Sequence, residues 1–416
     1  MSATAVWIFW ISLFIVVYSY VGYGLLLYAL VAIRRMIAKR PAGTKVKAAR
    51  VAGAALAEEH SEERSEPEVT LLIAAYNEEA FIRTKIANTL ELDYPPEKLK
   101  IVLVTDGSSD ATPAIVDEYR QIVHLYKKER KGKQDAVNRA MKSVRTPIVV
   151  FCDANTLLNR AAIRAIVTHY RDPRVGGVAG EKKVIAGDGQ GAVGGEGIYW
   201  KYESFLKRLD AELYTVVGAA GELWSIRTEL FRELPSNILL DDFVQSMYVC
   251  GKGYRMQYEP GAFAMETSSA NMREERKRKV RICAGGFQSI VLLRGLLNPF
   301  RYPVLSFQYV SHRVLRWTLC PLCLALLFFT DIVLVATRAG SIYDVLLAGQ
   351  VLFYVIAAGG WIMANRGVRR KLFFVPYYFF FMNVSVYLGF IRYLRGSQSA
   401  VWEKAQRVEE LKAMER

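Results

Sequence analysis

Residues 5–33 contain no charged side chain, and this stretch constrains the fold of the chain more than any other feature. About 20 apolar residues in an α-helix cross the hydrocarbon core of a bilayer, so the stretch is long enough to span one. It lacks the positively charged start and the short apolar core of a cleaved signal peptide. A run of Arg and Lys follows at 34–50, and such runs mark the cytoplasmic side. We therefore expect a retained membrane helix at 1–36 whose N-terminus lies outside the cell.

Three further apolar stretches, at 318–336, 343–364 and 373–391, are also long enough to cross a bilayer. The basic loop at 366–371 predicts a cytoplasmic position between the last two. One helix before the middle region and three after it would leave the C-terminus outside, yet the charged tail at 394–416 is typical of the cytoplasm. Either one segment is re-entrant or interfacial, or the first helix has the opposite orientation.

The residues between these apolar ends resemble an ordinary globular domain in composition. Short apolar runs at 69–75, 101–105 and 147–152 alternate with stretches of helical pattern. Strands that alternate with helices predict an α/β fold, a Rossmann-like and mostly parallel sheet with flanking helices. The boundaries that we expect are a linker at 37–67, the α/β domain at 68–282, interfacial helices at 283–317, about three membrane helices at 318–393 and the charged tail at 394–416.

Polar residues follow each of the three apolar runs, at 76–78, 106–108 and 153–155. Because open α/β sheets bind ligands beyond the carboxyl ends of their strands, we expect the three tips to converge on one site. Asp106 can accept a hydrogen bond from a nucleobase, and Tyr76 and Glu78 can form the wall of the same pocket.

Cations and carboxylates for a diphosphate and its reaction partner follow in the same region. Lys133 can reach a phosphate. Asp153 and Asn155 offer the oxygen ligands that Mg²⁺ or Mn²⁺ prefers. Asp241 and Asp242 stand just before a helical pattern, where a carboxylate can serve as a general base.

Arg313, Arg316 and Trp317 lie at the membrane face of the chain. Arg316 suits a pyrophosphate, and Trp317 suits stacking on a sugar ring. Each of these motifs alone has a simpler interpretation, as a turn, a helix cap, a solvated helix start or an interfacial anchor. Their joint order is what favours a functional site.

In this order the motifs resemble those of the family-2 glycosyltransferases. They are Val69-Thr-Leu-Leu-Ile-Ala-Ala-Tyr-Asn-Glu-Glu, Val104-Thr-Asp-Gly-Ser-Ser-Asp, Gly132-Lys-x-x-Ala-x-Asn and Asp153-Ala-Asn, followed by Asp241-Asp242 and Arg313-x-x-Arg316-Trp317, which look like the later motifs of the processive branch. That branch includes cellulose, hyaluronan, chitin and poly-N-acetylglucosamine synthases. The resemblance implies a GT-A-like fold for the α/β domain.

The resemblance also implies roles for individual residues. Asp106 would bind the uridine, Asp153 the donor and the metal ion, and Asp242 would be the catalytic base. The implied donor-binding set is Ala75, Tyr76, Glu78, Asp106, Lys133, Asp153, Arg313 and Arg316; the metal set is Asp153 and Asn155; the acceptor set is Gly221, Glu222 and Trp317. Asn155 replaces the second aspartate of the metal motif, and Arg313 replaces the glutamine that opens the last motif, which weakens the processive interpretation.

The predicted activity is inverting transfer from a UDP-sugar of the Glc or GlcNAc type, building a polysaccharide at the cytoplasmic membrane and coupled to its export. One alternative is the addition of a single sugar to a polyprenyl or other lipid acceptor. Another is a non-catalytic transport or nucleotide-sensing subunit. The expected partners are the UDP-sugar, a glycan or lipid-linked acceptor, membrane lipids and a small accessory membrane subunit.

Two other patterns are not assigned a function. The net charge of +15 is not accompanied by a helix-turn-helix, zinc-finger or RNA-binding signature, so we expect no nucleic acid; lipid headgroups or pyrophosphate explain the basic runs at 34–50 and 273–281 better. Gly189-x-Gly191-x-x-Gly194 matches a dinucleotide fingerprint but lacks a βαβ unit around it, so we expect a flexible loop.

Asp331 lies within an apolar stretch, where a carboxylate either serves a function or hydrogen-bonds a neighbouring helix.

Overall fold

A computed structural model describes residues 2–38, 66–185, 193–267, 272–366, 368 and 370–396. Most of the expected linker at 37–67 and nearly all of the tail at 394–416 lie outside the described residues. So does most of the glycine-rich run, since 186–192 are not described.

The α/β domain is built on one eight-stranded sheet with the order β3-β2-β1-β4-β7-β6-β8-β5. The strands are β1 (Val69–Ala75), β2 (Leu99–Asp106), β3 (Ile122–Lys127), β4 (Ile148–Asp153), β5 (Leu157–Leu158), β6 (Val175–Ile185), β7 (Leu223–Arg227) and β8 (Arg255–Thr267). The first four pair in parallel, β6 pairs in parallel with β8, and β5 and β7 are antiparallel to their neighbours. The predicted mostly parallel α/β sheet is confirmed, with its three expected strands lying side by side as β2-β1-β4.

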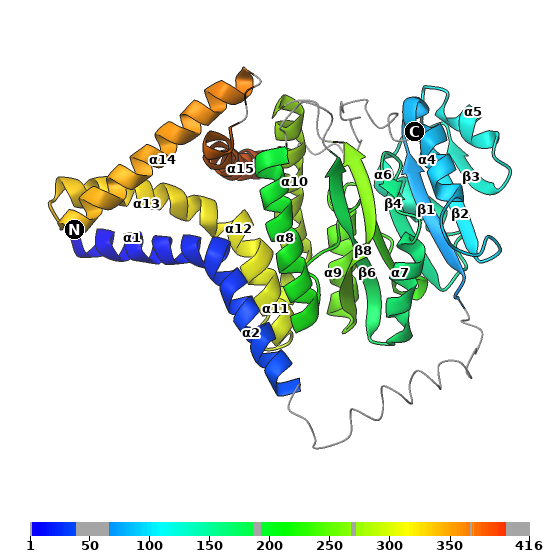
Figure 1. Cartoon of the computed structure of the whole chain (residues 1–416), viewed down its shortest axis with the longest axis horizontal. Helices are drawn as coiled ribbons and strands as arrows, with labels where there is room; N and C mark the ends of the chain where they lie inside the picture. Colours follow the sequence, from blue (N-terminus) through cyan, green and yellow to red (C-terminus); the bar gives the residue numbers. More distant parts are fainter. Residues whose placement is uncertain are drawn as a thin grey trace.

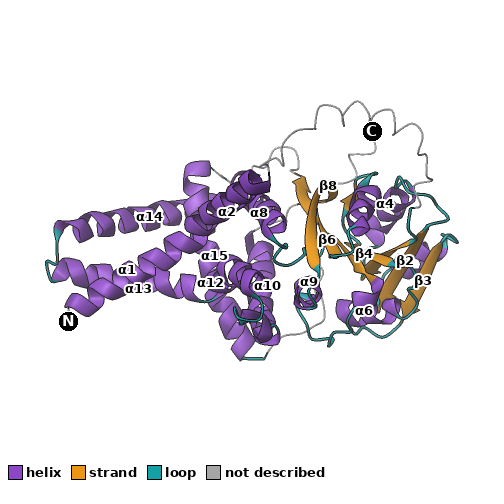
Figure 2. Ribbon diagram, turned by 90° about the horizontal axis from the view of Figure 1, so that it is seen from below, coloured by secondary structure: helices purple, strands orange, loops and turns teal. Residues whose placement is uncertain are grey.

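Helices cover both faces of this sheet. They are α4 (Glu79–Leu90), α5 (Thr112–Asp117) and α7 (Ala162–Thr168) on one face, and α6 (Lys133–Met141) and α9 (Asp241–Gly251) on the other. Successive side chains of a strand point to opposite faces, so Leu71 packs in the first core and Leu72 in the second. Figure 2 shows α4 and α6 on opposite sides of the strands. All seven residues of β1 are buried, as expected for a central strand covered on both faces.

Two long helices, α8 (Val193–Leu213) and α10 (Met272–Leu292), stand between the sheet and the membrane helices (Figure 1). The expected boundary between the α/β domain and the interfacial helices, at 282/283, falls inside α10. That helix ends at Leu292 and is followed by the short helices η4 (Arg294–Leu297), α11 (Pro303–Tyr309), η5 (Val310–Val314) and α12 (Leu315–Trp317).

Four helices are long and apolar enough to cross a membrane, among the described residues. The first runs through α1 (Ser2–Val17), the π-helix η1 (Tyr18–Gly22) and α2 (Tyr23–Ala38); the others are α13 (Leu319–Ala336), α14 (Ser341–Asn365) and α15 (Lys371–Leu394). The number and the positions agree with the sequence analysis. Asp331 accepts a hydrogen bond from Gln350, 2.5 Å away on α14, which agrees with the interhelical alternative.

α15 packs along α10, and the two helices run in the same direction. Tyr378 donates to Glu275 near their first turns, and Phe287 contacts Phe390 near their ends. The first half of α10 is highly charged, so a helix that packs along it is poorly suited to cross the hydrocarbon core. This packing favours the alternative in which one of the four segments lies at the membrane interface.

Gly389 is the point of closest approach between these helices. A Cβ added to Gly389 would lie 2.5 Å from the Cβ of Cys283 and 2.9 Å from the backbone nitrogen of Ala284. Gly389→Ala should therefore push the helices apart, at the ~1–3 kcal/mol typical of overpacking. We expect a lower melting temperature for the variant in detergent, measured by intrinsic fluorescence.

Gly349→Ala on α14 is the matched control, because no atom lies within 4 Å of the added Cβ. Equal melting temperatures of the two variants and the wild type would contradict the packing of α10 against α15.

Candidate active site

The tips of β1, β2 and β4 lie at one edge of the sheet, because the three strands are adjacent and parallel. Hydrogen bonds join the first two tips directly. The backbone N–H of Asn77 donates to the Ser108 hydroxyl at 3.1 Å, and that of Glu78 donates to the Thr112 hydroxyl at 2.8 Å. The polar tips of the three strands thus converge at one edge of the sheet, as predicted.

Asp106 is buried at the end of β2 and holds the loop that leads into α6. Its Oδ2 accepts from the backbone N–H groups of Lys131, at 2.9 Å, and Gly132, at 2.6 Å. Its Oδ1 is buried, faces Arg139 at 3.5 Å and accepts no hydrogen bond from the described residues. That oxygen therefore has capacity to accept a hydrogen bond, but it is buried beside the Arg139 guanidinium.

Tyr76, at the tip of β1, is covered by a cation. The guanidinium carbon of Arg130 lies 3.6 Å from the centre of the Tyr76 ring. Arg130 belongs to the same loop that Asp106 holds, next to Lys131. A planar ring and a planar guanidinium suit stacking on a nucleobase. The sequence analysis names Tyr76 and Asp106 but not Arg130.

Lys133 begins α6 and lies among carboxylates from two parts of the domain. Its Nζ donates to Asp153 Oδ1 at 2.5 Å. Burial disfavours its charged form, but the carboxylates of Asp153, Asp241 and Asp242 outweigh that effect and raise the pKa of Lys133. The ammonium group therefore stays charged and can serve as a counter-ion for a phosphate.

Asp241 and Asp242 form the first turn of α9, where the helix dipole stabilises negative charge. Burial and the neighbouring Asp241 raise the pKa of the Asp242 carboxyl to about 7, while Lys133 counteracts them. Gly221 lies against this carboxylate, since a Cβ there would be 3.3 Å from Asp242 Oδ2 and 3.6 Å from Lys133 Nζ. The lack of a side chain at Gly221 leaves the Asp242 oxygen accessible. A carboxylate that titrates near neutral pH is suited to general-base work.

Arg281, in the middle of α10, is the functional candidate that sequence reasoning missed. Burial lowers the pKa of its guanidinium, and the charges of Asp241, Asp153 and Asp242 act on it in the opposite direction. Arg281 is therefore a second cation within electrostatic reach of the acidic cluster. The signal in the sequence is its position at the end of the basic run 273–281. The run as a whole indicates binding of lipid headgroups or pyrophosphate, and it does not single out Arg281.

Glu222, predicted to border the acceptor, follows Gly221 and is bound to a buried lysine. Lys182 Nζ donates to Glu222 Oε1 at 2.5 Å and also pairs with the buried Glu266. Burial raises the pKa of Glu222, but Lys182 dominates and the net shift is downward. Glu222 is thus an ionised neighbour of the Asp242 carboxylate, whose pKa it raises slightly.

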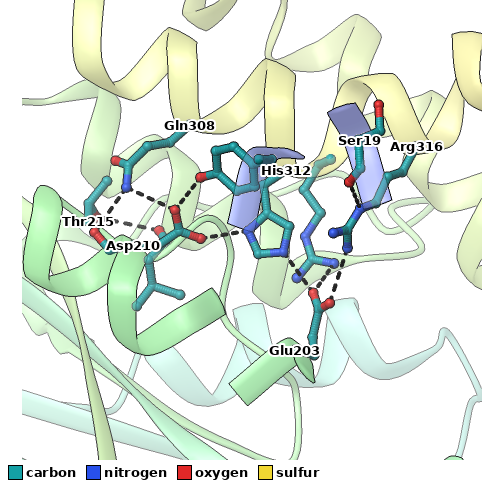
Figure 3. Close-up of polar contacts among 10 residues, drawn as sticks. Ser19, Glu203, Asp210, Thr215, Gln308, His312 and Arg316 are labelled. Atoms are coloured by element: carbon teal, nitrogen blue, oxygen red, sulfur yellow. Dashed lines mark hydrogen bonds and ion pairs between the residues drawn. The ribbon is translucent and has the colours of Figure 1, made fainter. Parts of the chain in front are cut away.

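Arg313 and Arg316, which the resemblance assigns to the donor site, contact a carboxylate of α8. Both pair with Glu203 of α8, Arg313 Nη1 at 2.7 Å and Arg316 Nη1 at 3.3 Å, as Figure 3 shows for the labelled Arg316. Arg316 also donates to the backbone oxygen of Ser19 at 3.1 Å. Trp317 packs against Phe243, the residue after Asp242, with ring centres 5.3 Å apart. Trp317 is therefore near Asp242, whereas Arg316 ties α8 to the first membrane helix and Arg313 joins η5 to α8.

His312 completes this buried network (Figure 3). Its Nε2 is 2.9 Å from Glu203, and its Nδ1 is 2.6 Å from Asp210, which also accepts from Tyr23 of α2. Burial raises the pKa of Glu203, but Arg313 and His312 outweigh it and the pKa lies well below its usual range. The network joins α2, α8 and η5 through charges that are shielded from water.

The oxygen ligands for a divalent ion are few. Among the described residues, no group of three His, Cys, Asp or Glu side chains could hold a metal by itself. Asp153 offers one carboxylate oxygen beyond the one bound to Lys133. Because Mg²⁺ commonly binds one or two carboxylates and takes its other ligands from phosphates and water, this donor set fits an ion that arrives with a diphosphate.

Glu203→Gln should destabilise the protein strongly, because it removes the charge that His312, Arg313 and Arg316 share. Breaking a buried pair on one side costs about 3–5 kcal/mol. We expect a large drop in the melting temperature. Glu212→Gln on the same helix is the control, since Glu212 pairs with Arg35 at the surface, where ion pairs contribute about 0–1 kcal/mol. Equal effects of the two substitutions would contradict a buried network.

The chain was compared with known families, proteins and structures. Residues 70–235 match the family model described as glycosyl transferase family 2. Poly-β-1,6-N-acetyl-D-glucosamine synthase of Staphylococcus aureus is 26% identical over 259 residues, which are 58% of this chain and 61% of that protein. The chain thus spans somewhat less than two thirds of the length of this relative.

Two further similarities concern other acceptors and donors. β-Monoglucosyldiacylglycerol synthase of Synechocystis sp. is 31% identical over 170 residues, 38% of this chain and 33% of that protein. A mannosyltransferase of Pyrobaculum calidifontis, solved in complex with GDP-Man and Mn²⁺, has 22% identity and a TM-score of 0.65, covering 93% of this chain and 99% of that one. This structural likeness confirms the GT-A-like fold. The matched family model shows a glycosyl transferase family 2 domain at residues 70–235, in a chain whose described residues also include four helices long and apolar enough to cross a membrane.

Proposed function

We propose that the chain transfers a sugar from a nucleoside-diphosphate sugar to an acceptor hydroxyl with inversion at the anomeric carbon. The observation that carries this proposal is Asp242, a half-buried carboxylate that lies beside Lys133 and Gly221 and whose pKa is raised to about 7. The family 2 domain supports the reaction class. Asp242 itself lies beyond the matched residues 70–235, so its role rests on this geometry.

The reaction needs one proton acceptor and a means to stabilise the leaving diphosphate. The acceptor oxygen forms a bond to the anomeric carbon while the bond from that carbon to the diphosphate oxygen breaks. Asp242 takes the hydroxyl proton, which its raised pKa makes favourable near neutral pH. Lys133 and Arg281 are the cations placed to balance the charge that develops on the diphosphate.

Asp153 would hold Mg²⁺ or Mn²⁺, with Asn155 next to it on the same turn. A divalent ion bound to the donor would neutralise the diphosphate as a Lewis acid. Lys133 donates to the same Asp153 carboxylate.

The donor and the product follow from the relatives by analogy. The relative from S. aureus is a poly-N-acetylglucosamine synthase, which favours UDP-GlcNAc and a polysaccharide product made at the cytoplasmic membrane. The relative from Synechocystis is a glycolipid synthase, and this favours the second candidate, transfer of one sugar to a lipid. Membranes incubated with a panel of UDP-sugars distinguish the two, since one product is a ladder of glycans and the other a single glycolipid.

The membrane helices support a location of the reaction at the lipid surface. The four candidate spans lie on one side of the α/β domain, next to its long helices α8 and α10 (Figure 1). We propose that the α/β domain faces the cytoplasm, as the basic run after the first helix predicts. The accessory subunit expected from the resemblance stays a prediction. UDP binding without any transfer would instead favour the non-catalytic alternative.

Asp242→Asn removes the proton acceptor but keeps the size of the side chain. Loss of a general base typically lowers rates by about 10²–10⁴-fold, so sugar transfer should drop by at least about 100-fold while UDP still binds. The measurement is release of UDP together with incorporation of labelled sugar. Asp172→Asn, an exposed carboxylate paired with Arg174, is the control that should leave both unchanged. Undiminished transfer by the Asp242 variant would refute the base assignment.

The pH dependence tests the same group in the unmodified protein. A general base works only when it is deprotonated. We therefore expect kcat/KM to increase as the pH is raised through about 7 and to be low at more acidic pH. Asp241→Asn removes a negative neighbour that raises the pKa of Asp242, so the acidic limb should move to lower pH. A limb that stays in place or moves to higher pH would contradict the coupling between the two carboxylates.

A further inference from the structure

Lys85 is a buried lysine on the apolar face of α4. The buried residues of this helix recur at the spacing of one helix face: Ile82, Lys85, Ile86 and Thr89. The side chain of Lys85 is 0% exposed, although an apolar side chain could fill this position without the cost of removing an amino group from water. Among the described residues, its polar contacts are with a thiol and a backbone oxygen, and no carboxylate pairs with it. An ion pair therefore does not explain why a lysine is buried here.

Both polar contacts of Lys85 are with the segment at the end of β4. Its Nζ donates to the backbone oxygen of Thr156 at 2.8 Å and to the Sγ of Cys152 at 3.0 Å. These two residues stand on either side of the turn that carries Asp153 and Asn155, the residues proposed to bind the divalent ion. Asp153 and Asn155 are half-buried, whereas Cys152 and Thr156 are buried. Lys85 thus connects the two ends of the turn.

Further hydrogen bonds hold the same segment. The hydroxyl of Thr156 donates to the backbone oxygen of Asp153 at 2.9 Å and lies 3.2 Å from the Sγ of Cys152. Asn88, also on α4, donates to the backbone oxygen of Leu158 at 2.9 Å and accepts from its backbone N–H at 2.8 Å. The turn after β4 and the short strand β5 that follows it are therefore both fixed to α4.

Two lysines act on Asp153 from opposite faces of the sheet. Lys133 begins α6, on the other face from α4, and donates to the Asp153 carboxylate itself. Lys85 contacts the ends of the turn instead. Lys133 can therefore balance the charge of Asp153, whereas Lys85 acts on the position of its backbone.

We propose that Lys85 is a positioning residue for the divalent ion, because it fixes the turn from which Asp153 and Asn155 offer their oxygen atoms. Mg²⁺ requires a defined ligand geometry, so a turn that is already held in place binds the ion more tightly than one that the ion has to order. Removing a group that orients metal ligands typically lowers metal affinity by about 10–100-fold. This inference rests on the proposed function, which assigns the ion to Asp153.

The test measures the binding of UDP, with Mn²⁺ or with EDTA, to the full chain in phosphatidylcholine nanodiscs by isothermal titration calorimetry. Lys85→Met keeps the length of the side chain and removes its hydrogen-bond donor. The Kd of the Mn²⁺ complex of UDP should rise at least about tenfold. The Kd of UDP in EDTA should stay unchanged, because the polar contacts of Lys85 include neither Asp106 nor Tyr76.

Thr89→Val is the matched control. Thr89 is buried on the same face of α4, and its hydroxyl donates to the backbone oxygen of Lys85 within the helix rather than to the turn. Both Kd values should match those of the wild type. The proposal is overturned if Lys85→Met binds the Mn²⁺ complex as the wild type does, if it loses affinity for UDP equally with and without Mn²⁺, or if Thr89→Val shows the same loss.

Cys152→Ala provides a second test that does not depend on the folding of Lys85→Met. It removes one of the two acceptors of Lys85 and keeps the contact with Thr156. Binding of the Mn²⁺ complex should weaken in the same direction, by less than in Lys85→Met. Wild-type affinity of Cys152→Ala for the complex would overturn the proposal.

The binding assay contains no sugar donor, so it separates this inference from the proposed function. A loss of affinity for the Mn²⁺ complex in Lys85→Met, in a chain that transfers no sugar, would uphold the positioning role and refute the transferase. Sugar transfer by the wild type, with unchanged affinity for the complex in Lys85→Met, would do the reverse.

Discussion

The ammonium group of Lys133 joins the two halves of the candidate site. It pairs with Asp153 from the end of β4 and lies within electrostatic reach of Asp241 and Asp242 at the start of α9. Without this cation the three half-buried carboxylates would repel one another. Lys133 in turn is placed by the loop that Asp106 holds through two backbone N–H groups. The nucleotide side and the acceptor side of the site therefore depend on one loop.

Much of this could be predicted from the sequence because it is local. The apolar runs predicted adjacent parallel strands, and parallel strands bring their tips to one edge, so Asp106 and Asp153 were placed correctly. The pKa of Asp242 could not be predicted, since it depends on burial and on Asp241 and Lys133 together. Arg281 and Arg130 were missed for the same reason: which face of a helix or loop meets the site is decided by tertiary packing.

The sequence does not reveal which groups Arg313 and Arg316 contact. The motif puts two arginines next to a membrane helix, and in this structure their partner is the buried Glu203. The two π-helices η1 and η5 meet at this network, where Tyr18 and Ser311 are 2.8 Å apart. Because π-helical turns interrupt the regular hydrogen-bond ladder, they leave backbone oxygens such as that of Ser19 free to accept from Arg316. The network thus fixes the first membrane helix against α8.

The stereochemistry of the product tests the central claim most directly. If Asp242 activates the acceptor for a single displacement, transfer from an α-linked UDP-sugar must give a β-linked product. The measurement is the coupling constant of the newly formed anomeric proton, followed by NMR during the reaction. A β-linked product at the earliest time points is the predicted result. An α-linked product would show that the configuration is retained and would contradict a mechanism with Asp242 as the base.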